Sequence, residues 1–371
     1  MKKIRVAVIG GGHLGQIHTR LLKSNLHASL VAVCDPQPLV QQKFIQQFDV
    51  RAVSDFRKIL PDIDAAVVAT PTSLHHAVAK ELLSHGIHLL IEKPVTNDAE
   101  QARELVELAK TNKCIVQVGH VERFNPAIQV ALKAVGQPRY IEAERLSGYT
   151  YRSTDIGVVH DLMIHDIDLA SWIFGSPVIE TRSVGMSVMG DHEDMAQSRL
   201  QFACGAVANL TASRCSYQPR RVLRLFGPAG FANVDLTANK VEVVQVPTWI
   251  GQREFDFKSA NTEQQAFVRE QLFHSILPKT EIVVEPANAI ALEHQDWLKA
   301  IGTNRQPLVS LEQAAIAIDV AERILEQIKS HSWLAGQRQT IGPFAIFDPM
   351  QIAPSPIPAS LSGNSVRRQA A

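Results

Sequence analysis

The first 120 residues alternate short apolar runs with amphipathic stretches. Runs rich in Val, Ile and Ala predict buried strands, and the segments between them have helical periodicity, as in Asp98–Lys110 behind an Asn97 or Thr96 cap. The predicted strands are Ile4–Ile9, Leu30–Cys34, Ala65–Ala69, His88–Ile91 and Ile115–Val118. A repeated strand–helix–strand order predicts a parallel sheet with helices on both faces.

After about residue 120 the pattern changes to longer strands joined by turns such as Ala203-Cys204-Gly205. The predicted strands here are Arg139–Leu146, Glu180–Met189, Ser198–Phe202, Ala206–Ser213, Val222–Phe226 and Lys240–Val246. Successive strands without intervening helices predict a largely antiparallel sheet. Two helices are expected next, at about Asn288–Gly302 and Leu311–Ser330, and the Pro- and Ser-rich segment from Gly336 onward predicts a flexible tail.

Composition adds limits to this α/β pattern. The 371 residues suggest two domains, and Lys plus Arg equals Asp plus Glu at 37 each, so no overall field attracts nucleic acid or an anionic membrane. No apolar run approaches the roughly 18 residues of a membrane span. The cysteines at positions 34, 114, 204 and 215 form no CxxC pair, and no signal peptide precedes the first strand, so a reducing cytoplasm is expected.

A glycine-rich turn follows the first predicted strand. Gly10, Gly12 and Gly15 form GxGxxG, and His13 and Leu14 begin the helical pattern that comes next. In this context the glycines permit a tight turn, a close backbone approach to a pyrophosphate and close packing of helix on strand. The amino terminus of the helix would then offer free N–H groups to the phosphates. We expect all five residues to bind a dinucleotide.

Further cofactor-binding candidates follow the next strands. Asp35 lies twenty residues after Gly15, where a carboxylate would bind ribose hydroxyls and repel a 2′-phosphate, which favours NAD over NADP. A solvated aspartate is the alternative interpretation. Thr70 and Pro71 follow the third main strand at the carboxyl edge of the sheet, which lines the nucleotide crevice. Either His75 or His76 on the following helix could face the cofactor, and the pattern leaves that choice open.

The sequence Glu92-Lys93-Pro94 ends the fourth main strand. A lysine at the carboxyl end of a central parallel strand would point into the crevice where a nicotinamide lies, and Pro94 stops the strand. Lys93 could hydrogen-bond a substrate hydroxyl and stabilise a developing alkoxide. A surface lysine with no such role is the alternative.

The segment HDLMIHDID, residues 160–168, concentrates histidine and aspartate. On a helix, Asp161, His165 and Asp168 would share one face, whereas His160 and Asp166 would lie elsewhere. His160 and His165 would be separated by about 140° around the helix, a poor arrangement for one metal ion, so no metal site is expected. A metal held by Asp161 and His165, or a purely structural polar face, remains possible on spacing alone.

Together these motifs resemble the Gfo/Idh/MocA oxidoreductase family over roughly residues 1–335. The features that carry the resemblance are GxGxxG, Asp35, Thr70-Pro71-Thr72, Glu92-Lys93-Pro94 and Gly119-His120 with Arg123-Phe124. The family's helix motif D-x-G-x-H-x-x-D aligns with Asp161, Met163, His165 and Asp168, and Met163 departs from the usual glycine.

The resemblance implies an α/β fold with a Rossmann NAD-binding domain over residues 1–121. An α/β domain with an open, mostly antiparallel sheet is expected over residues 122–335, followed by the tail, 336–371. That sheet commonly serves as an oligomer interface, so a homodimer or homotetramer is expected. Glu92 and Lys93 join the expected cofactor site.

The implied reaction is NAD-dependent oxidation of a secondary hydroxyl. His165 is the expected general base, because the pKa of an imidazole lies near neutrality, and Asp161 would orient the imidazole or the substrate. Lys93 would polarise the same oxygen, and the sequence leaves open whether Lys93 or His165 finally takes the proton. The cofactor supplies the redox chemistry.

For the substrate, the segments around residues 119–126 and 145–155 resemble the nucleotide-sugar 3-dehydrogenase branch of the family, the type acting on UDP-N-acetylglucosamine. This branch makes a 3-keto sugar for a partner aminotransferase in cell-envelope or lipid A synthesis. Arg145 and Arg152 could bind a pyrophosphate, or could form ordinary salt bridges on a sheet. The expected substrate-binding residues are Arg123, Asn125, Arg152, Asp161 and His165. A dehydrogenase of a free sugar or inositol, and a regulator that binds NAD without turnover, are the alternatives.

Overall fold

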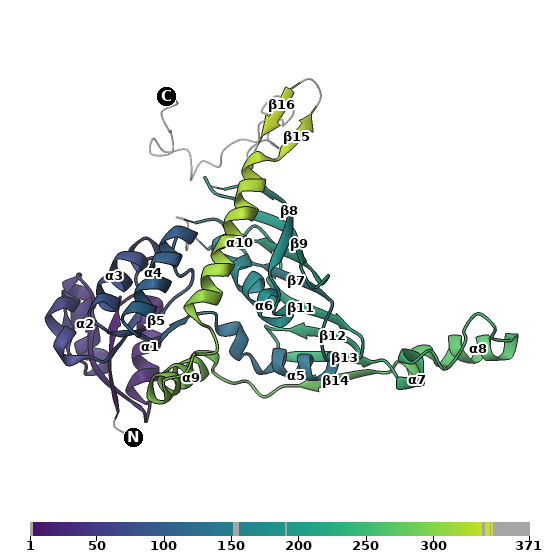
Figure 1. The fold of residues 1–371 in the computed structure, drawn as a ribbon, viewed down its shortest axis with the longest axis horizontal. Coiled ribbons are helices and arrows are strands. Elements are labelled where there is room, and N and C mark those ends of the chain that lie inside the picture. The colour runs from purple at the N-terminus through teal and green to yellow at the C-terminus, as the bar shows by residue number, and fades with distance from the viewer. Residues whose placement is uncertain (1–2, 151–155, 190, 336–337, 342, 344–371) are drawn as a thin grey trace.

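In the computed structural model, described for residues 3–150, 156–189, 191–335, 338–341 and 343, two large sheets lie side by side (Figure 1). The first has six parallel strands in the order β3-β2-β1-β4-β5-β6. Its strands are β1 Ile4–Ile9, β2 Ala28–Cys34, β3 Ala52–Val53, β4 Ala65–Val68, β5 His88–Ile91 and β6 Val116–Val118. The predicted parallel sheet is confirmed, and the two-residue β3 is an addition that is too short for a periodicity signal.

Helices cover both faces of the first sheet. The helices are α1 His13–Lys23, α2 Pro38–Phe48, α3 Thr72–Ser84 and α4 Ala99–Thr111, with a 3-10 helix η1 Phe56–Asp62. Alternate residues of β1 point to opposite faces: Val6 joins a core cluster with Leu22 of α1 and Phe44 of α2, whereas Ala7 joins the cluster that contains Leu82 of α3. This two-sided burial explains why the strands are continuously apolar.

The second sheet has eight strands in the order β14-β13-β12-β11-β7-β10-β9-β8, and all pairs are antiparallel except β7 with β10. Its strands are β7 Tyr140–Leu146, β8 Val178–Met186, β9 Met195–Phe202, β10 Val207–Ser213, β11 Arg220–Gly227, β12 Gly230–Asp235, β13 Lys240–Gln245 and β14 Lys279–Val283. The predicted, mostly antiparallel sheet is confirmed, with β12 and β14 added to the expected strands.

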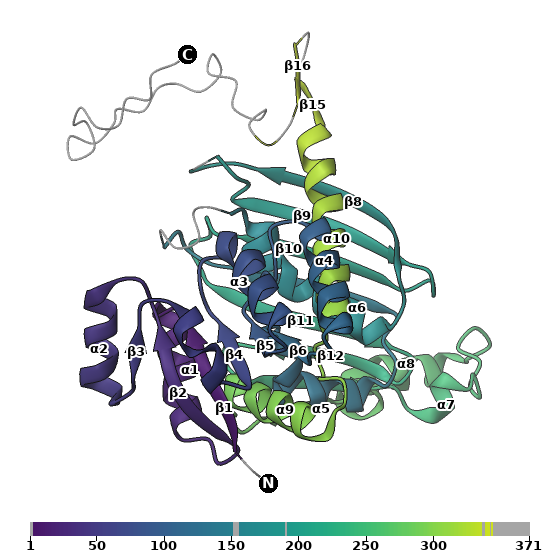
Figure 2. The ribbon, with the colours of Figure 1, turned by 60° about the vertical axis from the view of Figure 1, so that its left-hand side comes forward.

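Helices pack on one face of this second sheet, the face turned toward the first sheet (Figure 2). They are α5 Pro126–Val135, α6 Ile164–Phe174 and α10 Leu311–Ser330. The alternating burial of β7 shows the two faces: Ala143 and Arg145 are buried beneath the helices, whereas Glu142 and Glu144 lie on the other face and pair with Arg224.

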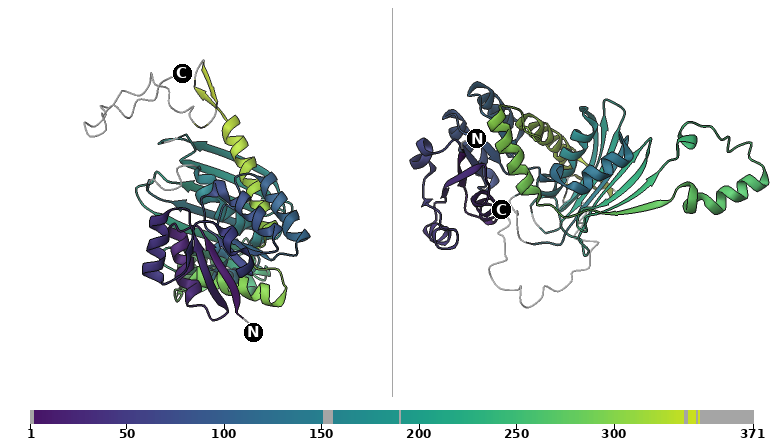
Figure 3. Two further views of the ribbon diagram at one scale, coloured as in Figure 1. Left: turned by 90° about the vertical axis from the view of Figure 1, so that its left-hand side faces the viewer. Right: turned by 90° about the horizontal axis from the view of Figure 1, so that it is seen from below.

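The remaining elements extend from this frame or connect it. They are η2 Val121–Phe124, η3 Val159–Met163, α7 Thr248–Gly251, α8 Thr262–Gln271, η4 Leu272–Ile276, α9 Ala289–Thr303 and the hairpin β15 Ser332–Ala335 with β16 Arg338–Ile341. The segment with α7 and α8 projects away from both sheets (Figures 1 and 3). No helix in the described part of the chain has the length and apolarity needed to cross a membrane.

Helix α9 returns to the first sheet although its sequence follows the second. Trp297 and Leu298 belong to the same buried cluster as Val6 and Val8 of β1. Helix α10 then packs against both α4 and α6. The two sheets are therefore held together by the last helices of the chain, and the carboxyl end of β5 faces the start of α6.

Candidate active site

The turn between β1 and α1 has the glycine geometry expected for a dinucleotide site. Gly10 has a φ of 104°, and a Cβ there would lie 2.4 Å from the carbonyl oxygen of Ala69. A Cβ at Gly15 would lie 1.9 Å from the carbonyl oxygen of Gly10, so helix and turn could not approach each other with any larger residue. Gly12 has open space around its Cβ position, which leaves its backbone accessible to a phosphate.

The residues around this turn fit a bound NAD. Gly12 is the N-cap of α1, with no side-chain cap, so the first N–H groups of His13 and Leu14 are available to a pyrophosphate. The Asp35 carboxylate is fixed at the edge of β2, because it accepts hydrogen bonds from the backbone N–H groups of Gly11 and Gln37, both at 2.9 Å. Thr70 has a buried Oγ1 without a hydrogen-bond partner among the described residues, as expected where a ligand supplies one.

The loop with Thr70 and Pro71 is tied to the loop after β5 by His75. Its Nδ1 lies 2.9 Å from the carbonyl oxygen of Pro94 and its Nε2 lies 2.9 Å from that of Thr70. Burial lowers the pKa of His75. His76 instead lies near the surface and pairs with Glu104 at 2.6 Å. Of the two histidines, His75 is the one that joins the two loops.

Lys93 and Asp161 meet across the two sheets. Lys93 follows β5, and its Nζ donates hydrogen bonds to the backbone carbonyl of Asp161 at 2.6 Å and to its Oδ1 at 3.1 Å. Their side chains are 17% and 24% exposed, so the pair is accessible to a ligand yet largely shielded from water. Asp161 lies in η3, a single π-helical turn, a type of distortion that is frequent at functional sites.

The imidazole of His165 lies at the first turn of α6, next to this pair. Burial, and then the positive charge of Lys93, lowers the pKa of His165 well below its usual value, so the ring is neutral near pH 7. Its Nδ1 is buried without a hydrogen-bond partner among the described residues. The ring of His120, which follows β6, meets His165 edge-on, with centroids 6.0 Å apart.

The π-helical turn is held in place by Glu193, which the sequence analysis did not identify. The Glu193 Oε1 accepts a hydrogen bond from the backbone N–H of Val159 at 3.0 Å. Its carboxyl occupies the place where a Cβ at Gly157 would lie. Burial raises the pKa of Glu193. An acidic side chain thus satisfies the start of the helix that carries Asp161 and His165.

Several other expected site residues have structural partners. Arg123 is 1% exposed and forms a two-pronged ion pair with Asp168, at 2.8 and 2.5 Å. Asn125 caps α5 by accepting a hydrogen bond from the backbone N–H of Ala127 at 3.0 Å. These contacts give Arg123, Asn125 and Asp168 roles in joining η2, α5 and α6. Arg152 lies outside the described residues.

The remaining charged residues near α6 follow the same pattern. Arg145 is buried and pairs with Asp166 at 2.8 Å and with Glu122 at 2.9 Å, so its guanidinium serves the protein interior rather than a pyrophosphate. Burial, and then the charges of His192 and Lys329, lowers the pKa of His160 to about 4. The described residues contain no group of three or more His, Cys, Asp or Glu arranged to hold a metal ion.

Arg221 is a candidate that the sequence analysis did not identify. Arg221 of β11 lies directly opposite Arg145 of the neighbouring strand β7. Its side chain therefore leaves the sheet on the same face as that of Arg145, the face that carries α6. Arg221 is exposed, and its positive charge contributes to lowering the pKa of His165. The alternation of strand faces could have indicated it once the register was known.

Comparison with known proteins gives family matches for both the first and the second sheet domain of the chain. Residues 4–120 match a family described as "Oxidoreductase family, NAD-binding Rossmann fold", and residues 129–233 match the GFO/IDH/MocA C-terminal domain. The chain is 38% identical over 244 residues to UDP-N-acetylglucosamine 3-dehydrogenase of Acidithiobacillus ferrooxidans, a match that covers 66% of this chain and 77% of that protein. It is 29% identical to an inositol 2-dehydrogenase of Rhizobium meliloti, over 57% of this chain and 69% of that protein.

Solved structures agree with these matches. The structure of the Acidithiobacillus ferrooxidans UDP-N-acetylglucosamine 3-dehydrogenase has a TM-score of 0.77 and 31% identity, covering 88% of this chain and 98% of that one. Levoglucosan dehydrogenase in complex with NADH has a TM-score of 0.73 at 18% identity, covering 88% and 97%, which shows a shared fold.

Proposed function

The chain belongs to the Gfo/Idh/MocA family of NAD-dependent oxidoreductases, and on that premise we propose that it oxidises the C3 hydroxyl of a UDP-N-acetylglucosamine-type nucleotide sugar. The product would be a 3-keto sugar, which an aminotransferase could use in lipid A or cell-envelope synthesis. The observation that supports the reaction type is the contact of Lys93 with Asp161 beside a neutral His165. The choice of substrate rests on the 38% identity to the UDP-N-acetylglucosamine 3-dehydrogenase.

The division of work follows from these three residues. The glycine turn and Asp35 would hold NAD⁺, which would supply the hydride acceptor. The Lys93 ammonium donates a hydrogen bond to the sugar oxygen and stabilises its negative charge, while Asp161 fixes the direction of the ammonium. His165 takes the hydroxyl proton, because burial and the charge of Lys93 keep its imidazole neutral.

Arg221 is the residue that we propose binds the diphosphate of the substrate. Its exposed guanidinium lies on the helix-bearing face of the second sheet and contributes positive potential at His165. A guanidinium binds phosphate oxygens with two parallel hydrogen bonds. Arg220 provides a matched control, because it pairs with Glu144 at 3.0 Å on the opposite face of the sheet.

The test is NADH formation with UDP-N-acetylglucosamine, glucose, glucuronate and inositol. We expect turnover with the nucleotide sugar, and Arg221→Ala should raise its KM roughly 10- to 150-fold, the size of one charge-assisted hydrogen bond. Arg220→Ala should leave KM unchanged. Turnover with free polyols alone would favour the alternative, a free-sugar or inositol dehydrogenase, and NAD binding without any turnover would favour a regulator.

We also propose that the protein acts in the cytoplasm as a homodimer or homotetramer, with copies meeting through the helix-free face of the second sheet. Polar side chains such as Glu142 and Arg224 cover that face. Light scattering on the purified protein would give the oligomeric state, and a monomer at micromolar concentration would contradict the proposal.

A further inference from the structure

Behind the candidate active site, Glu92 begins a buried line of polar side chains. Glu92 Oε1 lies 2.7 Å from His18 Nε2, and His18 Nδ1 lies 2.8 Å from His294 Nε2. The three residues come from the end of β5, from α1 and from α9. Both imidazoles are fully buried and Glu92 is 5% exposed. The return of α9 to the first sheet therefore completes a line that ends beside Lys93.

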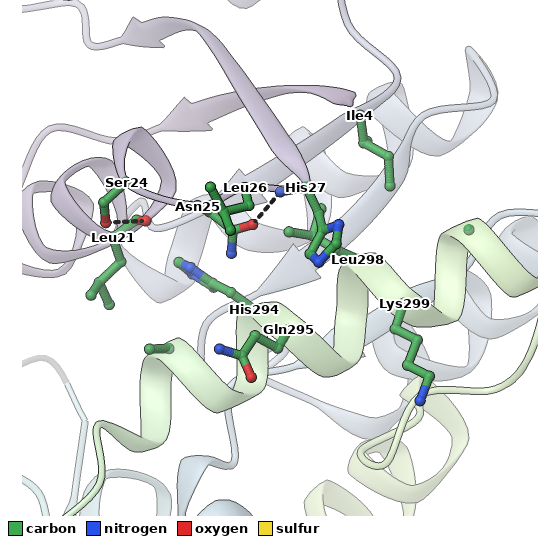
Figure 4. A pocket seen from close by; sticks show the side chains of 12 residues that line it. Ile4, Leu21, Ser24, Asn25, Leu26, His27, His294, Gln295, Leu298 and Lys299 are labelled. Atoms are coloured by element: carbon green, nitrogen blue, oxygen red, sulfur yellow. Dashed lines mark hydrogen bonds between the residues drawn. The ribbon is translucent and has the colours of Figure 1, made fainter. Parts of the chain in front are cut away.

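The other end of the line reaches a groove on the opposite edge of the sheet. The groove has a volume of about 880 Å³ and lies between the end of α1 and α9 (Figure 4). Its walls include Leu21, Leu26, His27, His294, Leu298 and Lys299. The ring of His294 points from α9 toward the α1 side of this groove (Figure 4). Its Nδ1 has no hydrogen-bond partner among the described residues.

Other unpaired polar atoms surround the line. Buried atoms without hydrogen-bond partners among the described residues include Oγ1 of Thr19, Oε1 of Gln117, both carboxyl oxygens of Glu293 and Nε1 of Trp297. Burial, and then the charges of Glu92 and Asp296, raises the pKa of Glu293 well above its usual value. Buried polar atoms without partners are rare in proteins, and water or a function explains them. Their concentration here favours a polar path over an ordinary core.

The hydrogen bonds define how the line holds a proton. When each imidazole carries its proton on Nε2, His18 donates to Glu92 and His294 donates to His18 Nδ1. A proton that arrives at His294 Nδ1 can release the Nε2 proton of His294 to His18. His18 then becomes an imidazolium paired with the Glu92 carboxylate, and His294 stays neutral. One proton is gained, and no heavy atom has to move.

The charges around the line favour this distribution. Burial, and then the charge of His18, lowers the pKa of His294 to about 3, so His294 passes a proton on instead of keeping it. Burial alone would raise the pKa of Glu92, but the hydrogen bond and charge of His18 together with the charge of Lys93 lower it. The other groups that face the line are Glu293 of α9, His120 after β6, and His27 and Lys299 at the groove.

We propose that His18 and His294 are positioning residues that fix the Glu92 carboxylate. They also allow one proton to reach or leave the His18 imidazole, next to this carboxylate, through the groove. Taking up that proton changes the charge of the line from −1 to 0. The inference rests on the proposed function, because the nicotinamide expected near Lys93 is positively charged when oxidised and neutral when reduced. When Glu92 is a carboxylate and both imidazoles are neutral, the net charge of −1 favours the binding of NAD⁺ over that of NADH. Protonation of the line weakens this preference.

The experiment measures the dissociation constants of NAD⁺ and NADH at about pH 6 and pH 8, where an imidazole changes charge. In the natural protein the ratio of the two constants should shift about tenfold toward NADH at the lower pH, the size expected for one charge acting at close range. His294→Phe keeps a ring but removes the nitrogen that accepts the hydrogen bond of a His18 imidazolium, so the charged form loses its support and the ratio should change little with pH. Gln295→Ala alters the groove without touching the line, and should behave like the natural protein.

Chemical rescue separates this role from a structural one. In His294→Ala, added imidazole should enter the groove and restore the pH dependence, whereas pyrrole, which has the same ring size but no acceptor nitrogen, should not. Equal rescue by pyrrole, or an unchanged pH dependence in both His294 variants, would overturn the inference. Absence of cofactor binding in the natural protein would contradict the proposed function itself, whereas binding with a pH-independent ratio would contradict only the buried line.

Discussion

Replacing Asp161 by Asn isolates the charge that fixes Lys93. The substitution keeps the shape of the side chain and the backbone carbonyl that accepts one Lys93 hydrogen bond at 2.6 Å. It removes the negative charge at the 3.1 Å contact, where the two side chains are 17% and 24% exposed. A hydrogen bond between charged groups contributes about 1.5–3 kcal/mol, so kcat/KM should fall roughly 10- to 150-fold.

The assay is initial-rate NADH formation with the best substrate, with Lys93→Met and the double variant measured alongside. If Asp161 acts through Lys93, the double variant should lose little more than Lys93→Met, with a coupling energy of about 1–3 kcal/mol. Asp319→Asn is a control, since Asp319 lies on the surface of α10 in a loose pair with Arg103 at 3.6 Å. Full activity of Asp161→Asn, or strictly additive losses, would refute the assignment.

Three further predictions follow from other contacts. Arg123→Ala leaves Asp168 buried without its partner and should lower the free energy of unfolding by about 3–5 kcal/mol in urea titration; a loss below about 1 kcal/mol would show that the pair is dispensable. The pKa of His160 is about 4 in the folded state, below the unfolded value near 6.5, so protonation of His160 favours the unfolded chain. As the pH is lowered from 7 to 5, the free energy of unfolding should therefore decrease by about 2 kcal/mol. His160→Gln should lose less stability than the natural protein in the same titration. Asp35→Ser removes the carboxylate that would repel a 2′-phosphate, so the kcat/KM ratio of NADP⁺ to NAD⁺ should rise at least about tenfold; an unchanged ratio would remove Asp35 from cofactor selection.

Local sequence patterns predicted the parallel sheet and the glycine turn at the amino-terminal end of the molecule. The glycine turn and the strand that precedes Lys93 depend on residues close together in sequence, and their backbone requirements leave a clear pattern. The helix motif was harder to interpret, because an ideal helix would place Asp161, His165 and Asp168 on one face in equal positions. The π-helical turn and the ion pair with Arg123 separate them: Asp161 meets Lys93, whereas Asp168 is buried.

Contacts between distant segments could not be predicted. His18 and His294 are 276 residues apart in sequence, and nothing in either local pattern indicates that α9 returns to the first sheet. The same limit affected Arg145. Its partner Asp166 follows a long connection, and the ion pair between them makes Arg145 unavailable to the expected pyrophosphate. Arg221, the candidate that takes its place, became visible only through the register of β11 against β7.

The transfer of deuterium from UDP-N-acetylglucosamine labelled at C3 to NAD⁺ tests the central claim most directly. Mass spectrometry of the reduced cofactor should show one deuterium per turnover with the natural protein, and Lys93→Met should form labelled cofactor at least about a hundredfold more slowly, the loss expected for a group that stabilises the reacting oxygen. Reduced cofactor without deuterium, or undiminished transfer by Lys93→Met, would contradict the assigned reaction and the role of Lys93.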